Sequence, residues 1–315
     1  MTGYGQEQGD GYLPPPPGVY SPLIYSPSQP SLTFPYYQLL SPSTSSEFSQ
    51  QLPDSSTSSQ NNTDQYTIEI QPQPESQIHV AGEVPIRQSR RYKQQDVKLD
   101  NGNFICDFTV PEKLINGIKL RDEDEFKKVR YTACTCDPDD FQKEKYVLRQ
   151  ELYKREIEIF IVITMYDEDA KSFARSFYGV VKNIYDLTKQ NNSHIWGNDG
   201  WKKVVVCVVS DGYEEINETT KAYLAAIGVY QEGVIKKEVN DKPVTAHIFE
   251  YTTQFCIDPN MNQVGEEVKH TPIQVLFCLK EENAKKINSH RWFFNAFSNK
   301  LDPKVCILLD LYRNL

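Results

Sequence analysis

Four short, largely apolar runs constrain the fold of this 315-residue chain more than any other feature of its sequence. They occupy residues 157–165, 204–209, 271–279 and 305–309, and a polar or charged residue follows each of them. Runs that are apolar throughout, and do not alternate with polar residues, are typical of strands buried on both faces of a parallel sheet. We therefore predict that all four runs are buried strands.

Helical patterns and one alternating segment separate these runs. Phe173, Phe177, Val180, Ile184 and Leu187 recur at helical spacing and predict an amphipathic helix that continues to about residue 189. Two further helices are predicted at 218–227 and 284–297, and an alternating strand at 244–251. Strands that alternate with helices in this way predict an α/β sheet with crossover connections.

The sequence before these elements has a different character. Residues 1–85 are rich in Pro, Ser, Gln and Tyr and contain too few clustered aliphatic residues to offset the entropy cost of folding, so we expect a disordered tail. Residues 86–150 predict a small β-rich region, and residues 151–315 contain the α/β sheet. A net charge of −9 argues against nucleic acid as a partner, since phosphate backbones require a basic surface.

The residues that follow the predicted strands are candidates for a binding site. In open α/β sheets, ligands bind beyond the carboxyl ends of the strands. The side chains expected at that edge include one lysine, two strand-end acids, and a threonine–tyrosine pair with a following glutamate. In chain order the candidates are Thr164, Tyr166, Glu168, Asp211, Gly212, Lys280 and Asp310.

The chemistry of this edge points to phosphates held through a metal ion. The glycine-rich patterns of dinucleotide and nucleoside triphosphate sites do not follow any of these strands, and neither does the Gly-x-Ser-x-Gly pattern of hydrolases. An acidic edge that binds phosphates then needs Mg²⁺ or Mn²⁺ between carboxylate and phosphate. Asp310 is the candidate metal ligand and Asp211 a candidate nucleoside ligand. The alternative is that these acids only end strands or cap helices.

Long strings of the sequence resemble the fungal chitin synthases, which are processive glycosyltransferases with a GT-A core. The resemblance covers roughly the last two thirds of the chain. It is carried by RYTACTCDPDDF (130–141), ITMYDEDAKSFARSFYGVVKNI (163–184), WGNDGWKKVVVCVVSDG (196–212) and VLFCLKEENAKKINSHRWFFNAF (275–297). It implies a GT-A-like, Rossmann-like nucleotide-sugar-binding sheet. It also implies inverting transfer of N-acetylglucosamine from UDP-N-acetylglucosamine to a growing β-1,4 chitin chain of the cell wall, with Mg²⁺ or Mn²⁺ as cofactor.

The resemblance also implies roles for individual residues. Thr164, Tyr166 and Glu168 match positions that line the uracil and ribose pocket. Asp211 matches the acid that binds the nucleoside, in a turn completed by Gly212. All five are therefore expected to bind the nucleotide half of the donor.

The remaining two candidates match positions on the phosphate side of the donor. Lys280 matches a lysine that faces the diphosphate, and Asp310 matches the acid that coordinates the metal. Asp167 departs from the family pattern, which usually has Asn at this position. After Asp310 the family continues with Val-Gly-Thr and then the acceptor half, whereas this sequence continues with Leu311.

We therefore expect the chain to be the donor-binding fragment of a chitin synthase, with a GT-A sheet that is incomplete at its C-terminus. The catalytic general base, the motif that holds the acceptor chitin chain and the membrane-spanning helices would lie in segments missing from this sequence. The complete enzyme is expected at the cytoplasmic face of the plasma membrane, and a homodimer is expected. The alternative is a non-catalytic, nucleotide-binding relative that acts as a regulatory or interaction protein.

Overall fold

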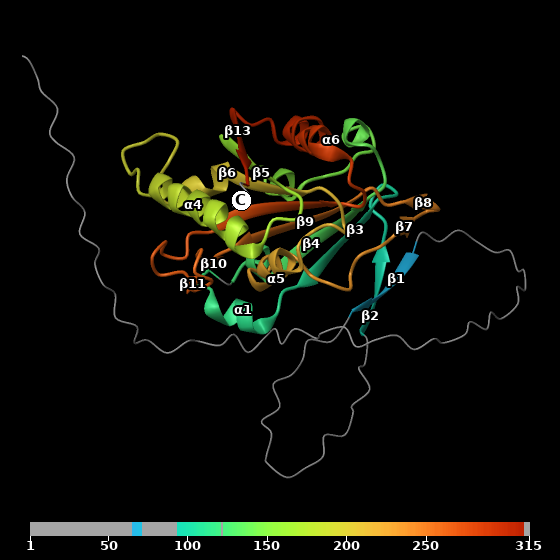
Figure 1. Ribbon diagram of the computed structural model, residues 1–315, viewed down its shortest axis with the longest axis horizontal. Coiled ribbons are helices and arrows are strands. Elements are labelled where there is room, and N and C mark those ends of the chain that lie inside the picture. Colours follow the sequence, from blue (N-terminus) through green and yellow to red (C-terminus); the bar gives the residue numbers. More distant parts are fainter. Residues whose placement is uncertain (1–64, 71–92, 121, 312–315) are drawn as a thin grey trace, which may run out of the picture. The chain divides into compact units, whose positions relative to one another are not determined.

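Seven strands form one central sheet in the computed structural model, which describes residues 65–70, 93–120 and 122–311 (Figure 1). The first four strands of the spatial order are mutually parallel, and the other three pairings are antiparallel. The predicted α/β sheet is thus confirmed, with a mixed strand direction. The order is β13 (Val305–Asp310), β5 (Ile159–Met165), β6 (Val204–Ser210), β12 (Ile273–Lys280), β9 (Ala246–Thr253), β4 (Lys128–Cys134) and β3 (Phe104–Thr109).

Helices cover both faces of this sheet, and each face has its own apolar core. On one face lie α4 (Ala170–Thr188) and α5 (Glu218–Ala226), whose buried aromatic rings contact each other across the two helices. On the other face lie α6 (Lys285–Arg291), the π-helical segment η3 (Trp292–Ser298) and α7 (Asn299–Leu301). Figure 1 shows α4 and α6 on different sides of the strands. The structure is therefore a three-layer α/β sandwich.

The helix ends follow from local sequence. The Asn217 side chain caps α5 by accepting a hydrogen bond from the Thr219 N–H at 2.9 Å, and Gly228 follows the helix with a φ of 84°. Asp169 caps α4 in the same way, accepting from the Ser172 N–H at 2.8 Å. The helix predicted at 218–227 is confirmed, with Asn217 and Gly228 at its two ends.

The predicted helix at 284–297 is present, but it is not a uniform α-helix. It changes at Trp292 from α-helical to wider π-helical turns. These turns keep four apolar side chains buried against the sheet, and the ring of Phe293 stacks on Phe160 of β5 at 4.4 Å. A single 3.6-residue period cannot describe such a segment.

Shorter elements complete the fold. The remaining helices are α1 (Glu112–Gly117), α2 (Asp124–Lys127), η1 (Pro138–Asp140), α3 (Arg149–Leu152) and η2 (Gly200–Lys203). The two-stranded sheets pair β1 (Gln65–Ile70) with β2 (Lys93–Lys98), β7 (Glu238–Val239) with β8 (Lys242–Pro243), and β10 (Cys256–Ile257) with β11 (Gln263–Val264). Because β3 and β4 extend the central sheet, the region at 86–150 is continuous with the sheet that follows it.

Two expectations differ from the structure. The run at 305–309 forms the predicted strand, but β13 is an edge strand of the sheet and is not buried: Val305, Ile307 and Leu308 are 51%, 37% and 46% exposed. The expected disordered tail at 1–85 lies mostly outside the described residues. Gln65–Ile70 is the exception, because it pairs antiparallel with β2 as strand β1.

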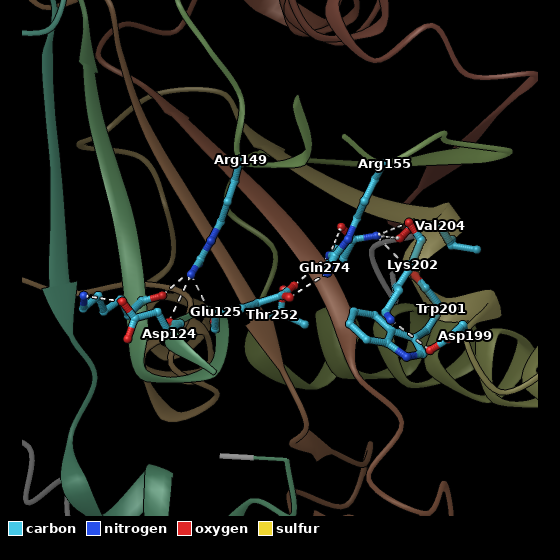
Figure 2. A network of polar contacts seen from close by, with 11 residues as sticks. Asp124, Glu125, Arg149, Arg155, Asp199, Trp201, Lys202, Val204, Thr252 and Gln274 are labelled. Carbon is cyan, nitrogen blue, oxygen red and sulfur yellow. Dashed lines mark hydrogen bonds and ion pairs between the residues drawn. The ribbon is translucent and has the colours of Figure 1, made fainter. Parts of the chain in front are cut away.

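A buried polar network fixes the sheet at the amino ends of β6 and β12 (Figure 2). The Arg155 guanidinium donates to both carboxylate oxygens of Glu125, at 2.7 and 2.6 Å, and to the Gln274 amide oxygen at 2.7 Å. The Gln274 amide nitrogen donates to three backbone carbonyls, those of Trp201, Lys202 and Val204. This network therefore joins β12 to the start of β6, so the register of both strands is set at the end opposite the candidate site.

Candidate functional site

The register of the parallel strands brings the predicted site residues to one edge of the sheet. Thr164 of β5 is the direct partner of Asp310 of β13, and Ser210 of β6 pairs with Leu279, the residue before Lys280. Asp211 follows Ser210 directly. Four of the seven predicted residues therefore lie on adjacent strand ends, in a segment that we call the strand-end rim (Thr164, Asp211, Lys280 and Asp310).

The first pair in the rim is a buried ion pair between Asp211 and Lys280. Their Oδ1 and Nζ atoms are 2.6 Å apart, and the side chains are only 11% and 2% exposed. The Lys280 ammonium also donates to Asn288 Oδ1 at 3.1 Å, and Asp211 Oδ1 accepts from the Ala284 N–H at 3.0 Å. Both charges are thus held in fixed positions by the β12–α6 segment.

The second pair in the rim is more exposed. The Thr164 hydroxyl donates to Asp310 Oδ1 at 2.8 Å, and the Lys286 ammonium forms an ion pair with Asp310 Oδ2. The hydrogen bonds from Lys286 and Thr164 hold the pKa of Asp310 below its usual value. Asp310 therefore presents an ionised carboxylate, and its side chain is 55% exposed.

Tyr166 and Glu168 lie in the turn between β5 and α4, beside the strand-end rim. The Tyr166 N–H donates to Glu168 Oε2 at 2.7 Å, and the backbone carbonyl of Glu168 accepts from the Thr220 hydroxyl at 2.7 Å. One Glu168 oxygen is thus used to close its own turn, while the Thr220 bond ties the turn to α5. In this structure Glu168 fixes the turn that carries the Tyr166 side chain.

Gly212 occupies a position that suits glycine. Its φ is 118°, a backbone conformation that side-chain-bearing residues rarely adopt. A Cβ there would lie 2.0 Å from Glu215 Oε2. The glycine therefore lets the chain turn sharply directly after Asp211.

Sequence reasoning missed a buried chain of hydrogen bonds behind the rim. His247, at the start of β9, is fully buried and its Nε2 lies 2.6 Å from Glu281 Oε2, while its Nδ1 lies 3.0 Å from the Tyr131 hydroxyl. Lys237 completes the chain through an ion pair of 2.5 Å with Glu281 Oε1. The only signal in the sequence was a histidine within an otherwise apolar strand, and its partner follows Lys280 directly.

Glu281 connects this series of hydrogen bonds to the turn beside the rim. Its backbone N–H donates to the Thr245 carbonyl at 3.0 Å, and its carbonyl accepts from the Tyr213 N–H at 3.3 Å. Glu281 thereby joins the end of β12 to the turn at Gly212. Burial lowers the pKa of His247, and the hydrogen bond that His247 makes to the Glu281 carboxylate only partly opposes this. Burial acts to raise the pKa of Glu281, but the bonds from Lys237 and His247 outweigh it and hold the pKa below its usual value.

The rim can supply one protein ligand to a magnesium or manganese ion, provided that a substrate supplies other ligands. Within the described ranges, no group of three or more His, Cys, Asp or Glu side chains is placed to hold a metal by itself. Asp310 offers one ionised carboxylate, and the cation now beside it is the ammonium of Lys286. Mg²⁺ is commonly bound by one or two carboxylates together with phosphates and water. Asp310 and the phosphates of a nucleotide would supply such a set.

Comparison with known families agrees with this arrangement of strands and side chains. A model of the chitin synthase N-terminal domain matches residues 92–158, and a model of the chitin synthase-like glycosyltransferase domain matches residues 159–312. The chain belongs to the chitin synthase family. All residues of the strand-end rim lie in the part matched by the glycosyltransferase domain.

Relatives within the chitin synthase family are about half identical to this chain. Chitin synthase 2 of Rhizopus oligosporus is 52% identical over 232 residues, which cover 73% of this chain and 27% of the relative. Chitin synthase C of Aspergillus oryzae is 48% identical over 253 residues, covering 78% of this chain and 27% of the relative. Chitin synthase 1 of Gibberella zeae is 53% identical over 223 residues, covering 70% and 25%. The chain thus spans about a quarter of the length of the curated chitin synthases that it matches.

Among the helices of the described residues, none has the length and apolar character needed to cross a membrane.

Proposed function

We propose that this chain is the donor-binding part of a chitin synthase that transfers N-acetylglucosamine from UDP-N-acetylglucosamine to a growing β-1,4-linked chain, with inversion at the transferred sugar. The observation that carries the proposal is the strand-end rim, in which two acids, a lysine and a threonine from four adjacent strands meet within a chitin synthase domain.

The buried pair of the rim would hold the nucleotide. Asp211 would accept hydrogen bonds from the nucleoside, and its position is fixed by the Ala284 N–H and by the ion pair with Lys280. Lys280, which ends β12, would place a fixed ammonium near the diphosphate and oppose its negative charge. Because both side chains are preorganised, little reorganisation is needed when the donor binds.

The exposed pair of the rim would hold the metal ion. Asp310 would supply the protein carboxylate, with Thr164 fixing the direction of that carboxylate through its hydroxyl. When bound, Mg²⁺ or Mn²⁺ would neutralise charge on the departing diphosphate. Tyr166, in the turn closed by Glu168, would line the uracil and ribose pocket beside Asp211.

The proposal also implies a location. The donor nucleotide sugar is cytosolic and chitin is exported, so the complete enzyme would work at the plasma membrane with this domain on the cytoplasmic side. The complete enzyme would also bind the acceptor chitin chain.

Isothermal titration calorimetry with UDP in the presence of Mn²⁺ tests the proposal. Wild-type protein should bind UDP, and Asp211→Ala should lose at least about tenfold in affinity, the equivalent of one hydrogen bond to a charged group. Asp199→Ala is the matched control, because Asp199 is an exposed acid that pairs with Lys202 away from the rim. Equal UDP affinity in wild type and Asp211→Ala would show that Asp211 does not bind the nucleotide.

A further inference from the structure

Among the described residues outside the predicted site, Lys286 is the one whose charge directly contacts the exposed side of the strand-end rim. It lies in α6, and its ammonium forms an ion pair with Asp310 Oδ2 while Thr164 binds the other carboxylate oxygen. The predicted metal ligand is therefore occupied by a positive charge from the protein itself.

The start of α6 is anchored beside the rim on both sides of Lys286. Before it, the Ala284 N–H donates to Asp211 Oδ1 at 3.0 Å, and after it, Asn288 Oδ1 accepts from the Lys280 ammonium at 3.1 Å. The Lys286 side chain itself is 55% exposed. The backbone position of Lys286 is thus fixed, whereas its flexible four-carbon stem leaves the ammonium free to move.

The hydroxyl of Ser289 is a second polar group of α6, and it is buried. Ser289 is three residues after Lys286, so both lie on neighbouring positions of one helix face. The Ser289 side chain is 1% exposed, and its buried hydroxyl has no hydrogen-bond partner among the described residues. Buried hydroxyls are normally satisfied by protein, water or ligand.

We propose that Lys286 is a donor-binding residue that alternates between two anions: it pairs with Asp310 in the free protein, and it binds the diphosphate once a divalent cation has taken its place at Asp310. This inference rests on the proposed function of the rim as a nucleotide-sugar site.

Electrostatics explains why the two cations exclude each other. A divalent ion bound to Asp310 would lie within a few ångströms of the ammonium, and like charges at that separation repel each other. The phosphates that the same ion binds carry the nearest uncompensated negative charge. Lys286 would thus lose one anionic partner and gain another within reach of its own side chain.

Two binding measurements on Lys286→Met test the proposal. Without nucleotide, Mn²⁺ binding followed by electron paramagnetic resonance should become about two- to fivefold tighter, because an exposed ion pair no longer competes. At saturating Mn²⁺, UDP affinity measured by calorimetry should fall about tenfold, because one charged hydrogen bond to phosphate is lost. UMP, which lacks the second phosphate, should lose less affinity than UDP.

Lys285→Met is the matched control, since it removes an adjacent charge whose side chain forms no ion pair with another described residue. If Lys286→Met changes Mn²⁺ and UDP binding no more than Lys285→Met does, the proposal for Lys286 is wrong while the rim remains a donor site. Failure of wild-type protein to bind UDP with Mn²⁺ would overturn the proposed function and this inference together. Thermal unfolding of each variant checks that the fold is retained.

Discussion

Replacing Lys280 by Met should destabilise the protein, and replacing its partner as well should restore most of the loss. Met keeps the length and apolar stem of the lysine but removes the charge that lies 2.6 Å from Asp211. The Asp211 carboxylate, only 11% exposed, would then keep the Ala284 N–H as its partner in this contact and lose its counter-charge.

The size of the effect follows from the burial of the pair. Removing one partner of a buried ion pair costs about 3–5 kcal/mol, because an uncompensated charge remains in a poorly solvated position. Removing both charges avoids that penalty, so Asp211→Asn/Lys280→Met should be less destabilised than the sum of the single variants by several kcal/mol. The same cycle on the exposed Asp199–Lys202 pair, at 78% and 43% exposure, should give a coupling below about 1 kcal/mol.

Guanidinium denaturation followed by circular dichroism measures the wild type and the six variants of the two cycles. The denaturant concentration at the unfolding midpoint should shift while the dependence of the unfolding free energy on denaturant stays constant. The shift then reports a change in stability and not a change in the unfolded or native state. If the Asp211 and Lys280 effects simply add, then the two charges are independent and the rim is not a preorganised ion pair. Additive effects would also remove the basis for assigning Lys280 a fixed position opposite the diphosphate.

Three further variants test other parts of the structure. Gly212→Ala should cost about 1–3 kcal/mol and weaken UDP binding in calorimetry, because the Glu215 side chain can move away but the φ of 118° remains strained. Burial raises the pKa of Glu250 from 4.5 to about 7, so the folded protein loses stability as pH rises through this range; Glu250→Gln should be more stable than wild type above pH 7, by about 3 kcal/mol, and should lose that advantage near pH 4. Unfolding curves at both pH values check this, and a pH-independent difference would contradict it. Arg155→Met should cost about 3–5 kcal/mol in the same assay by leaving Glu125 buried without its cation, and a loss below 1 kcal/mol would show that the network in Figure 2 is dispensable.

The strands of the parallel half were predicted well from the sequence, because a strand that is buried on both faces consists of consecutive apolar residues. It could not distinguish β13 from β5 or β6, since the three runs have the same character and differ only in their place in the sheet. Strand order depends on contacts between residues far apart in the chain, which local patterns do not record. The reversal of direction at β9 was hidden for the same reason.

The rim was predictable where a residue's role follows from its place at a strand end. Asp211, Lys280 and Asp310 each follow or end a strand, and the rule that ligands bind at such edges placed them together. His247 was missed because antiparallel β9 brings its first residues, and not its last, to the same edge. Lys286 was missed because an isolated lysine on an amphipathic helix normally faces water.

The order in which the strands are synthesised has a consequence for when the site becomes usable. Thr164 and Asp310 are hydrogen-bonded across a separation of 146 positions. At a translation rate of roughly 5–20 residues per second, roughly 7–30 s pass between them on the ribosome. Asp211 and Lys280 are both made before Asp310, so a nascent chain can form the buried ion pair of the rim before the Thr164–Asp310 pair exists. If the rim binds a metal–nucleotide complex as proposed, that complex could be held completely only after β13 has joined the edge of β5.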